Sequence, residues 1–115
     1  MNLLTEAAAL IRGMNIPVET GVFAAIAPDT YCVITPLSDV FELYANNTPH
    51  ADVQEARISI FTKGGYTSFK NSIVNALLQN GFIITDRRYL GFETGTGYHH
   101  YAVDAAKYYE FDMEE

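Results

Sequence analysis

Residues 66–82, YTSFKNSIVNALLQNGF, contain the clearest helix signal in the chain. Apolar side chains recur from Phe69 to Leu77 at the three- and four-residue steps that align them on one helix face. The run Asn80-Gly81-Phe82 is typical of a left-handed C-cap, in which the apolar residue after the glycine packs back on the last turn. We therefore predict a helix over residues 66–80.

A second helix is expected near the start of the chain. Apolar side chains recur at three- and four-residue steps over residues 3–13, which we predict to be helical. Asn2 or Thr5 is a suitable N-cap. Gly13 and Pro17 favour an end to the helix, because the residue before a proline is pushed out of the α region.

The other segments favour short strands divided by turns. The expected strands are residues 21–27, 31–35, 40–45, 55–61, 82–89 and 98–109, with turns at 28–29, 36–39 and 94–97. The resulting order, α-β-β-β-β-α-β-β, predicts an α+β fold with a mainly antiparallel sheet and two helices packed on one of its faces. With 115 residues the chain is expected to form a single α+β domain over residues 1–115, with an acidic C-terminus at 110–115 that frays.

A projecting hairpin is expected between the third and fourth strands, because residues 46–52 are polar and rich in turn formers. A turn centred on Pro49 and His50 places Glu42 opposite Arg57. A slip of one residue in the register removes that pair.

Two helices with one apolar stripe each cover only one side of such a sheet, so its other side needs a partner. The chain has eight tyrosines and seven phenylalanines, and aromatic rings are enriched at the centres of protein interfaces. The alternative is that the rings line the core with their hydroxyls at its edge. The residues predicted to form a subunit or partner interface are Tyr44, Arg57, Phe61, Arg87, Arg88, Tyr108 and Tyr109.

Charge gives a second hypothesis about assembly. In a head-to-tail ring, different patches of one subunit meet at every joint. We expect the acidic end at 110–115 to meet a basic patch near Arg87 or Arg57 of the next subunit. A solvated acidic tail is the alternative.

The composition argues against several classes of function. The formal net charge is −7, which opposes binding to the phosphate backbone of nucleic acids. A single cysteine, Cys32, excludes a disulfide framework within the chain. The N-terminal residues lack the basic region of a signal peptide, and no apolar run reaches the roughly 20 residues of a membrane helix.

Residues that suggest catalysis do not form a recognisable set. His99 and His100 are adjacent on an expected strand, so their side chains point to opposite faces and cannot coordinate the same metal ion. Cys32 lies in an apolar run, where a thiol behaves as a small hydrophobe. The glycines of residues 64–65 and 95–97 are explained by turns. We expect no catalytic, cofactor or metal site, and the chain is not expected to be an enzyme.

The overall pattern nevertheless resembles a known family. The residues that carry the resemblance are the N-terminal helix, the run from 27 to 36, the strand into 58–63, the Asn80-Gly81-Phe82 cap and the run from 88 to 103. They resemble the small tail-terminator, tail-completion or minor tail proteins of long-tailed phages and prophages.

The resemblance implies a structural subunit that forms a ring, typically a hexamer, at the tail end or the head–tail joint and terminates tail-tube assembly. It implies as partners further copies of the chain, the major tail protein and head–tail connector proteins. It places the protein in the virion, after synthesis in the cytoplasm of a bacterial host. Two other classes remain open: a small-ligand-binding or enzymatic α+β domain with His99 or His100 near a pocket, and an adaptor for a different protein.

Overall fold

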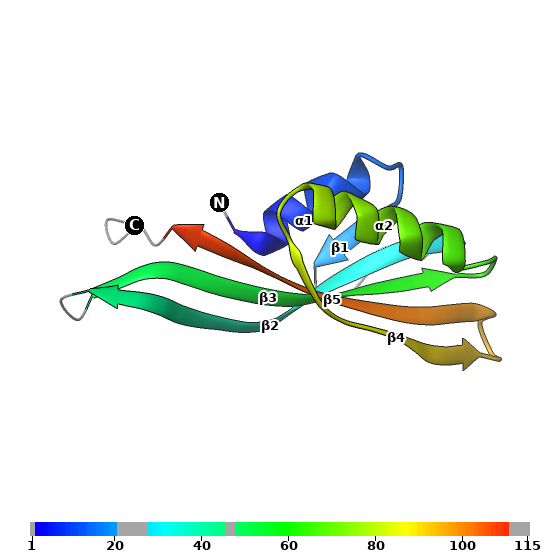
Figure 1. Cartoon of the computed structure of the whole chain (residues 1–115). Helices are drawn as coiled ribbons and strands as arrows, with labels where there is room; N and C mark the ends of the chain where they lie inside the picture. The colour runs from blue at the N-terminus through cyan, green and yellow to red at the C-terminus, as the bar shows by residue number, and fades with distance from the viewer. Residues whose placement is uncertain (1, 21–27, 46–47, 111–115) are drawn as a thin grey trace.

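A computed structural model describes residues 2–20, 28–45 and 48–110, which form two helices and five strands (Figure 1). The elements, in chain order, are α1 (Leu3–Arg12), β1 (Val18–Thr20), β2 (Thr30–Ala45), β3 (Thr48–Thr62), α2 (Thr67–Gln79), β4 (Ile83–Glu93) and β5 (Tyr98–Glu110). The predicted α+β class and the succession of helices and strands are confirmed.

The described strands form one sheet in the order β1-β2-β3-β5-β4. β2 pairs with β3, β3 with β5 and β5 with β4, all antiparallel. Only β1, in the described sheet, runs parallel to its neighbour, with Val18 opposite Cys32. β1 and β4 are therefore the edge strands.

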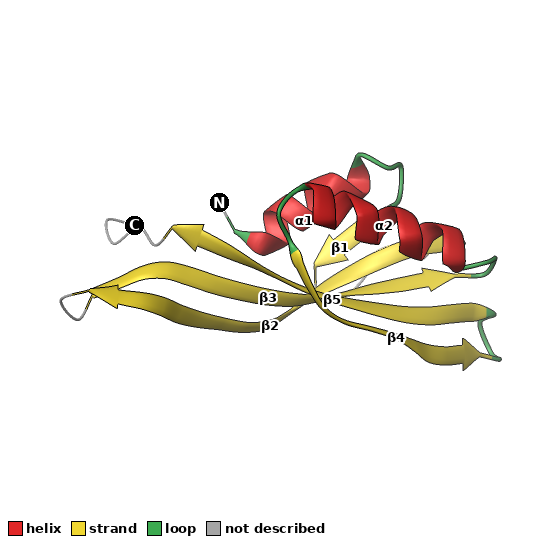
Figure 2. Cartoon of the chain, viewed as in Figure 1, coloured by secondary structure: helices red, strands yellow, loops and turns green. Residues whose placement is uncertain are grey.

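Both helices lie on the same face of the sheet, as predicted (Figure 2). We call this the helix face and the other the open face. On the helix face, aliphatic side chains from alternate strand positions pack against the helices, because successive side chains of a strand point to opposite faces. The side chains at the centre of this core, each no more than 1% exposed, include Leu3, Ile11, Ile34, Ile58, Ile60, Ile73, Leu77 and Val103.

The helix ends follow the local sequence signals. Asn2 caps α1, because its side chain accepts a hydrogen bond of 2.8 Å from the backbone N–H of Thr5. At the end of α2, Gly81 has a φ of 84°, and the N–H of Phe82 donates to the carbonyl of Leu77 at 3.0 Å. These are the features of a Schellman cap, and Phe82 is buried against the core.

The strands between the helices differ from the prediction at the expected turn after residue 35. The expected turn at 36–39 is wrong: β2 runs without a break from Thr30 to Ala45 and accommodates Pro36 with a bulge between Pro36 and Ser38. The bulge keeps the strand paired while one extra residue is inserted. The predicted strand 21–27 lies outside the described residues.

The hairpin exists, but its predicted register is wrong. Glu42 lies opposite Ala51, and Arg57 lies opposite Thr35. Pro49 and His50 belong to β3, so the strands meet at the pair Ala45 and Thr48. Residues 46–47, which connect them, and the acidic end 111–115 are outside the described part of the chain.

The outer half of the hairpin, residues 38–45 and 48–55, extends past the helices at one end of the molecule (Figure 1). We call it the arm. It contributes to an elongated shape, with principal extents of 54 × 24 × 23 Å. In the residues described, neither helix has the length and apolar character needed to cross a bilayer.

Candidate interaction surfaces

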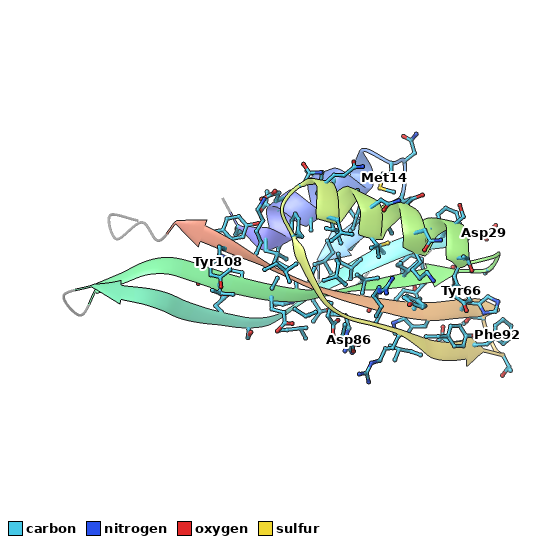
Figure 3. All side chains as sticks on the ribbon, viewed as in Figure 1. Met14, Asp29, Tyr66, Asp86, Phe92 and Tyr108 are labelled. Carbon is cyan, nitrogen blue, oxygen red and sulfur yellow. The ribbon has the colours of Figure 1, made fainter. Side chains whose placement is uncertain are left out.

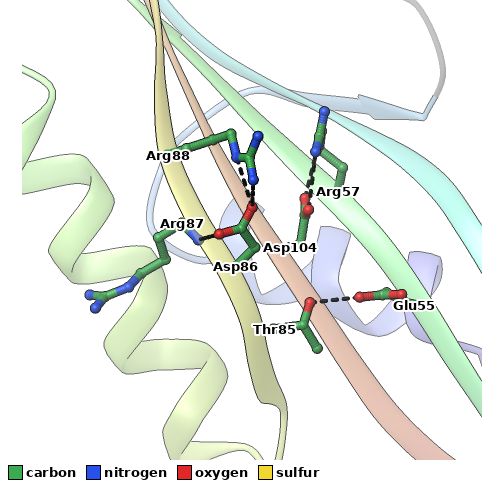
Figure 4. Close-up of polar contacts among 7 residues, drawn as sticks. All are labelled: Glu55, Arg57, Thr85, Asp86, Arg87, Arg88 and Asp104. Atoms are coloured by element: carbon green, nitrogen blue, oxygen red, sulfur yellow. Dashed lines mark hydrogen bonds and ion pairs between the residues drawn. The ribbon is translucent and has the colours of Figure 1, made fainter.

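The open face carries an ion pair at its centre. Arg57 on β3 and Asp104 on β5 are directly opposite in the register. The Nε and Nη2 atoms of Arg57 donate to the two carboxylate oxygens of Asp104 at 2.8 and 3.1 Å (Figure 4). This two-point geometry is the strongest form of the arginine–carboxylate contact, and the hydrogen bond raises the pKa of Arg57. The charge of the Arg57 guanidinium is therefore paired within the subunit.

Further polar contacts continue from this ion pair to the edge strand β4. Thr85 donates to Glu55 at 2.6 Å, and Arg88 pairs with Asp86 at 2.7 Å (Figure 4). Arg87 differs, because its guanidinium forms no hydrogen bond or ion pair with any other described residue. Of the three arginines predicted at an interface, only Arg87 presents an uncompensated charge.

Four rings form an open-face aromatic cluster next to this layer. Phe61 stacks on Tyr31 at 4.9 Å and on His100 at 4.2 Å between ring centroids. Tyr98 meets the rings of Tyr31 and Phe61 edge-on, and its hydroxyl donates to the carbonyl of Pro28 at 2.5 Å. Phe61 thus lies on the face without helices, as predicted, and its neighbours partly bury it.

A second group, the helix-face aromatic cluster, lies on the other side of the same end of the sheet. Tyr66, at the start of α2, stacks on Tyr89 at 5.1 Å and on Tyr101 at 5.5 Å. Phe92 packs on His99 at 4.8 Å, and the hydroxyl of Tyr89 is 3.0 Å from Nδ1 of His99. Figure 3 shows Phe92 at the tip of this end and Tyr66 beside it.

The outer part of this cluster remains in contact with solvent. Tyr89 is 44% exposed, Leu90 43% and Phe92 50%. Tyr89 and Phe92 lie opposite Tyr101 and His99, and Leu90 lies between them at a break in the register. We call these three residues near the end of edge strand β4 the β4 patch. The sequence did not lead us to predict this patch, although Tyr89-Leu90-Gly91-Phe92 forms an apolar run at the end of a predicted strand.

The tyrosines predicted at an interface have different environments. The hydroxyl of Tyr109 donates to Glu6 on α1 at 2.9 Å, and Lys107 contacts the same carboxylate at 2.5 Å. Burial and the Glu6 carboxylate raise the pKa of Tyr109. Tyr109 therefore joins β5 to α1 within the subunit, and its interface role stays a prediction.

Tyr108 is 49% exposed on the other side of β5, opposite Val53 of the arm. The backbone of Tyr44 pairs with Pro49 in the arm, and its side chain is outside the described set. For these two residues the interface role stays a prediction.

The two histidines point to opposite faces, as their adjacency predicts. His99 belongs to the helix-face aromatic cluster and His100 to the open-face aromatic cluster. Burial lowers the pKa of His100, and its Nε2 atom is buried without a hydrogen-bond partner in the described structure. Its imidazole is therefore held neutral against Phe61.

Neither histidine lines a surface hollow at the other end of α1. That hollow, of about 390 Å³, lies by the turn from α1 into β1, and its lining is Arg12, Asn15, Ile16, Pro17, Val18 and Glu19. Among the described residues, no three metal-ligating side chains lie close enough together to hold an ion. Cys32 is fully buried in the core, and burial raises the pKa of its thiol to about 12.

The exposed side chains of the β4 patch therefore offer a surface for contact with another molecule at one end of the sheet, and the arm projects at the other end (Figure 1). Neither a scan against protein-family models nor a search of curated proteins finds a match to this chain.

Proposed function

We propose that the chain is a structural subunit of a phage or prophage tail, which forms a ring at the tail end or head–tail joint and terminates tail-tube assembly. The observation that carries the proposal is the β4 patch, because large apolar side chains that remain exposed at a strand edge favour contact with another protein. The assignment to a tail rests on the resemblance of the sequence. The proposal assigns the chain no catalytic step and no cofactor.

The composition of the surface supports an assembly role. Neither described helix covers the open face, and its polar groups pair with one another through Arg57–Asp104 and Arg88–Asp86. Exposed apolar side chains gather in the β4 patch at one end of the sheet. A net charge of −7 also suits a ring through which DNA passes without being held.

The function is tested by adding the purified chain to tail tubes assembled from the major tail protein of the same phage or prophage. We expect rings on one end of each tube in negative-stain images, and tubes that stop growing when the chain is present. Tubes that bind no chain and elongate at an unchanged rate contradict the proposal. A chain that instead changes its melting temperature with a metabolite supports the small-ligand alternative.

A further inference from the structure

The two ends of the molecule differ in charge as well as in shape. No lysine or arginine occurs between Arg12 and Arg57, so the arm contains acidic residues and no cation at neutral pH. Asp39 on β2 is exposed, and Asp52 on β3 is half-buried. Glu42 and Glu55 bring the acidic residues in the arm sequence to four. The β3 strand of the arm also pairs with the end of β5, from Ala51 opposite Glu110 to Glu55 opposite Ala106. The arm is thus an acidic projection whose β2 edge is the unpaired one in the described sheet.

Four of the seven cationic side chains lie away from the arm: Lys63, Lys70, Arg87 and Arg88. Lys63 and Lys70 lie over rings at the opposite end, and Arg87 and Arg88 lie in the middle of β4, opposite Val103 and Ala102. Arg88 is paired with Asp86, Lys63 lies 3.7 Å from Asp29, and Lys70 lies over the ring of Tyr101. Arg87 has no such partner among the residues described, and the register places it on the same face as Tyr89. An uncompensated cation therefore lies beside the β4 patch.

The arm sequence also contains apolar residues. Leu37, at its base, is 45% exposed, and the arm sequence includes Val40, Phe41, Leu43 and Tyr44. From residue 35 onward, β2 has no strand on its outer side in the described sheet, because β1 pairs only with Cys32, Val33 and Ile34. The arm thus combines apolar residues, acidic residues and an unpaired strand edge.

We infer that the arm of one subunit docks on the β4 patch of the next copy of this chain. The acidic arm complements Arg87, and the apolar residues of both surfaces leave water together. The arm and the patch lie at opposite ends of the long axis (Figures 1 and 3). The contact is therefore head-to-tail, and repeated contacts of this kind close into a ring or continue as a filament. The inference deepens the proposed function, on which it rests, by naming both sides of the joint.

Two variants separate the two halves of the joint. The patch variant, Leu90→Asp with Phe92→Asp, keeps the arm and places carboxylates on the patch. The arm variant lacks residues 42–45 and 48–51. Because Phe41 is opposite Asp52, this deletion shortens both strands equally and preserves the register below it. Leu78→Asp on α2, where the side chain is 52% exposed, is the matched control for the patch.

Each variant and the wild-type chain are compared by native mass spectrometry, alone and mixed. We expect Leu78→Asp to assemble like wild type and each joint variant alone to be monomeric. The mixture of the two variants is expected to form a one-to-one heterodimer and nothing larger, because only one productive joint is left. Circular dichroism and the melting temperature report whether each variant is folded, and the single variant Leu90→Asp serves if the double one unfolds.

Other outcomes overturn the inference in distinct ways. A patch variant that still assembles alone indicates a joint that does not use the patch. An arm variant that still assembles alone indicates a joint that does not use the arm. In both cases the wild-type ring, and with it the proposed function, survives. Wild-type chain that caps tail tubes but stays monomeric in solution and on the tube contradicts the joint, whereas failure to bind tubes contradicts the function.

Discussion

The two faces of the sheet are stabilised by different means, although they share the same strands. On the helix face, aliphatic residues such as Ile34 and Ile58 are fully buried under α1 and α2. On the open face, side chains one position along the same strands pair within the layer, as Arg57 does with Asp104 and Phe61 with His100. The comparison shows that one sheet is stabilised by aliphatic burial on one face and by polar and aromatic pairing on the other.

The first prediction concerns the helix face and has the largest expected effect. Ile58→Ala removes three carbons from a side chain with no exposed surface and is expected to reduce the free energy of unfolding by about 2–5 kcal/mol. Val33→Ala, on the half-buried open face, is the matched comparison and should cost about 1 kcal/mol. Urea unfolding measures both, and equal losses would contradict the distinction between the faces.

The second prediction breaks the ion pair on the open face. Asp104→Ala leaves the guanidinium of Arg57 without its two acceptors, and since the Arg57 side chain is 34% exposed, water compensates in part. We expect a loss of about 1–3 kcal/mol in the free energy of unfolding.

The more exposed pair provides the control. Asp86→Ala removes the partner of Arg88, where the two side chains are 38% and 60% exposed. Its expected cost is below about 1 kcal/mol. If Asp86→Ala lowers the free energy of unfolding as much as Asp104→Ala does, the Arg57–Asp104 pair stabilises the fold no more than the exposed Arg88–Asp86 pair.

The third prediction concerns pH. The folded state holds His100 neutral below its ordinary pKa of 6.5 because the ring is buried, although nearby Glu93 opposes that shift and Arg57 adds to it. Below pH 6.5 the unfolded chain therefore binds more protons at this site than the folded chain. Stability rises with pH across this window, and acidification destabilises the fold.

His100→Phe tests this directly, since it keeps a ring against Phe61 and removes the titration. Melting temperatures measured across the window should fall less steeply with acidification in the variant than in wild type. His99→Phe, on the other face, serves as the comparison. An unchanged slope in His100→Phe would show that the acid sensitivity arises elsewhere.

The smallest expected effect on stability is at the β4 patch. Leu90→Asp changes a side chain that is 43% exposed, so the free energy of unfolding should stay within about 0.5 kcal/mol of wild type. Chemical denaturation at a concentration where every variant is monomeric checks this. A large loss would place Leu90 in the fold of the subunit rather than in a contact between subunits.

Local patterns in the sequence predicted the local features of the fold. The helices over 3–13 and 66–80, the cap at Gly81 and the turn at 94–97 depend on residues that are close in the chain, and the structure has them. The α+β class follows from the same patterns, because it needs only the order and type of the elements.

Features that join distant segments escaped the prediction. The continuity of β2 past Pro36 depends on pairing with β3, which tolerates the proline by means of a bulge. The contacts of Glu6 with Lys107 and Tyr109, and of Arg57 with Asp104, link residues 47 to 103 positions apart. Strand register decides which of these side chains meet, and the sequence pattern alone left that register open.

The most direct test of the account is the mass of the wild-type chain by sedimentation equilibrium over a wide range of concentrations. Two complementary ends on each subunit predict that the average mass rises from the 12.8 kDa monomer, passes the dimer and reaches a plateau at a closed ring. A mass that stops at the dimer would contradict the account, because a head-to-tail contact leaves one free arm and one free patch on every open chain.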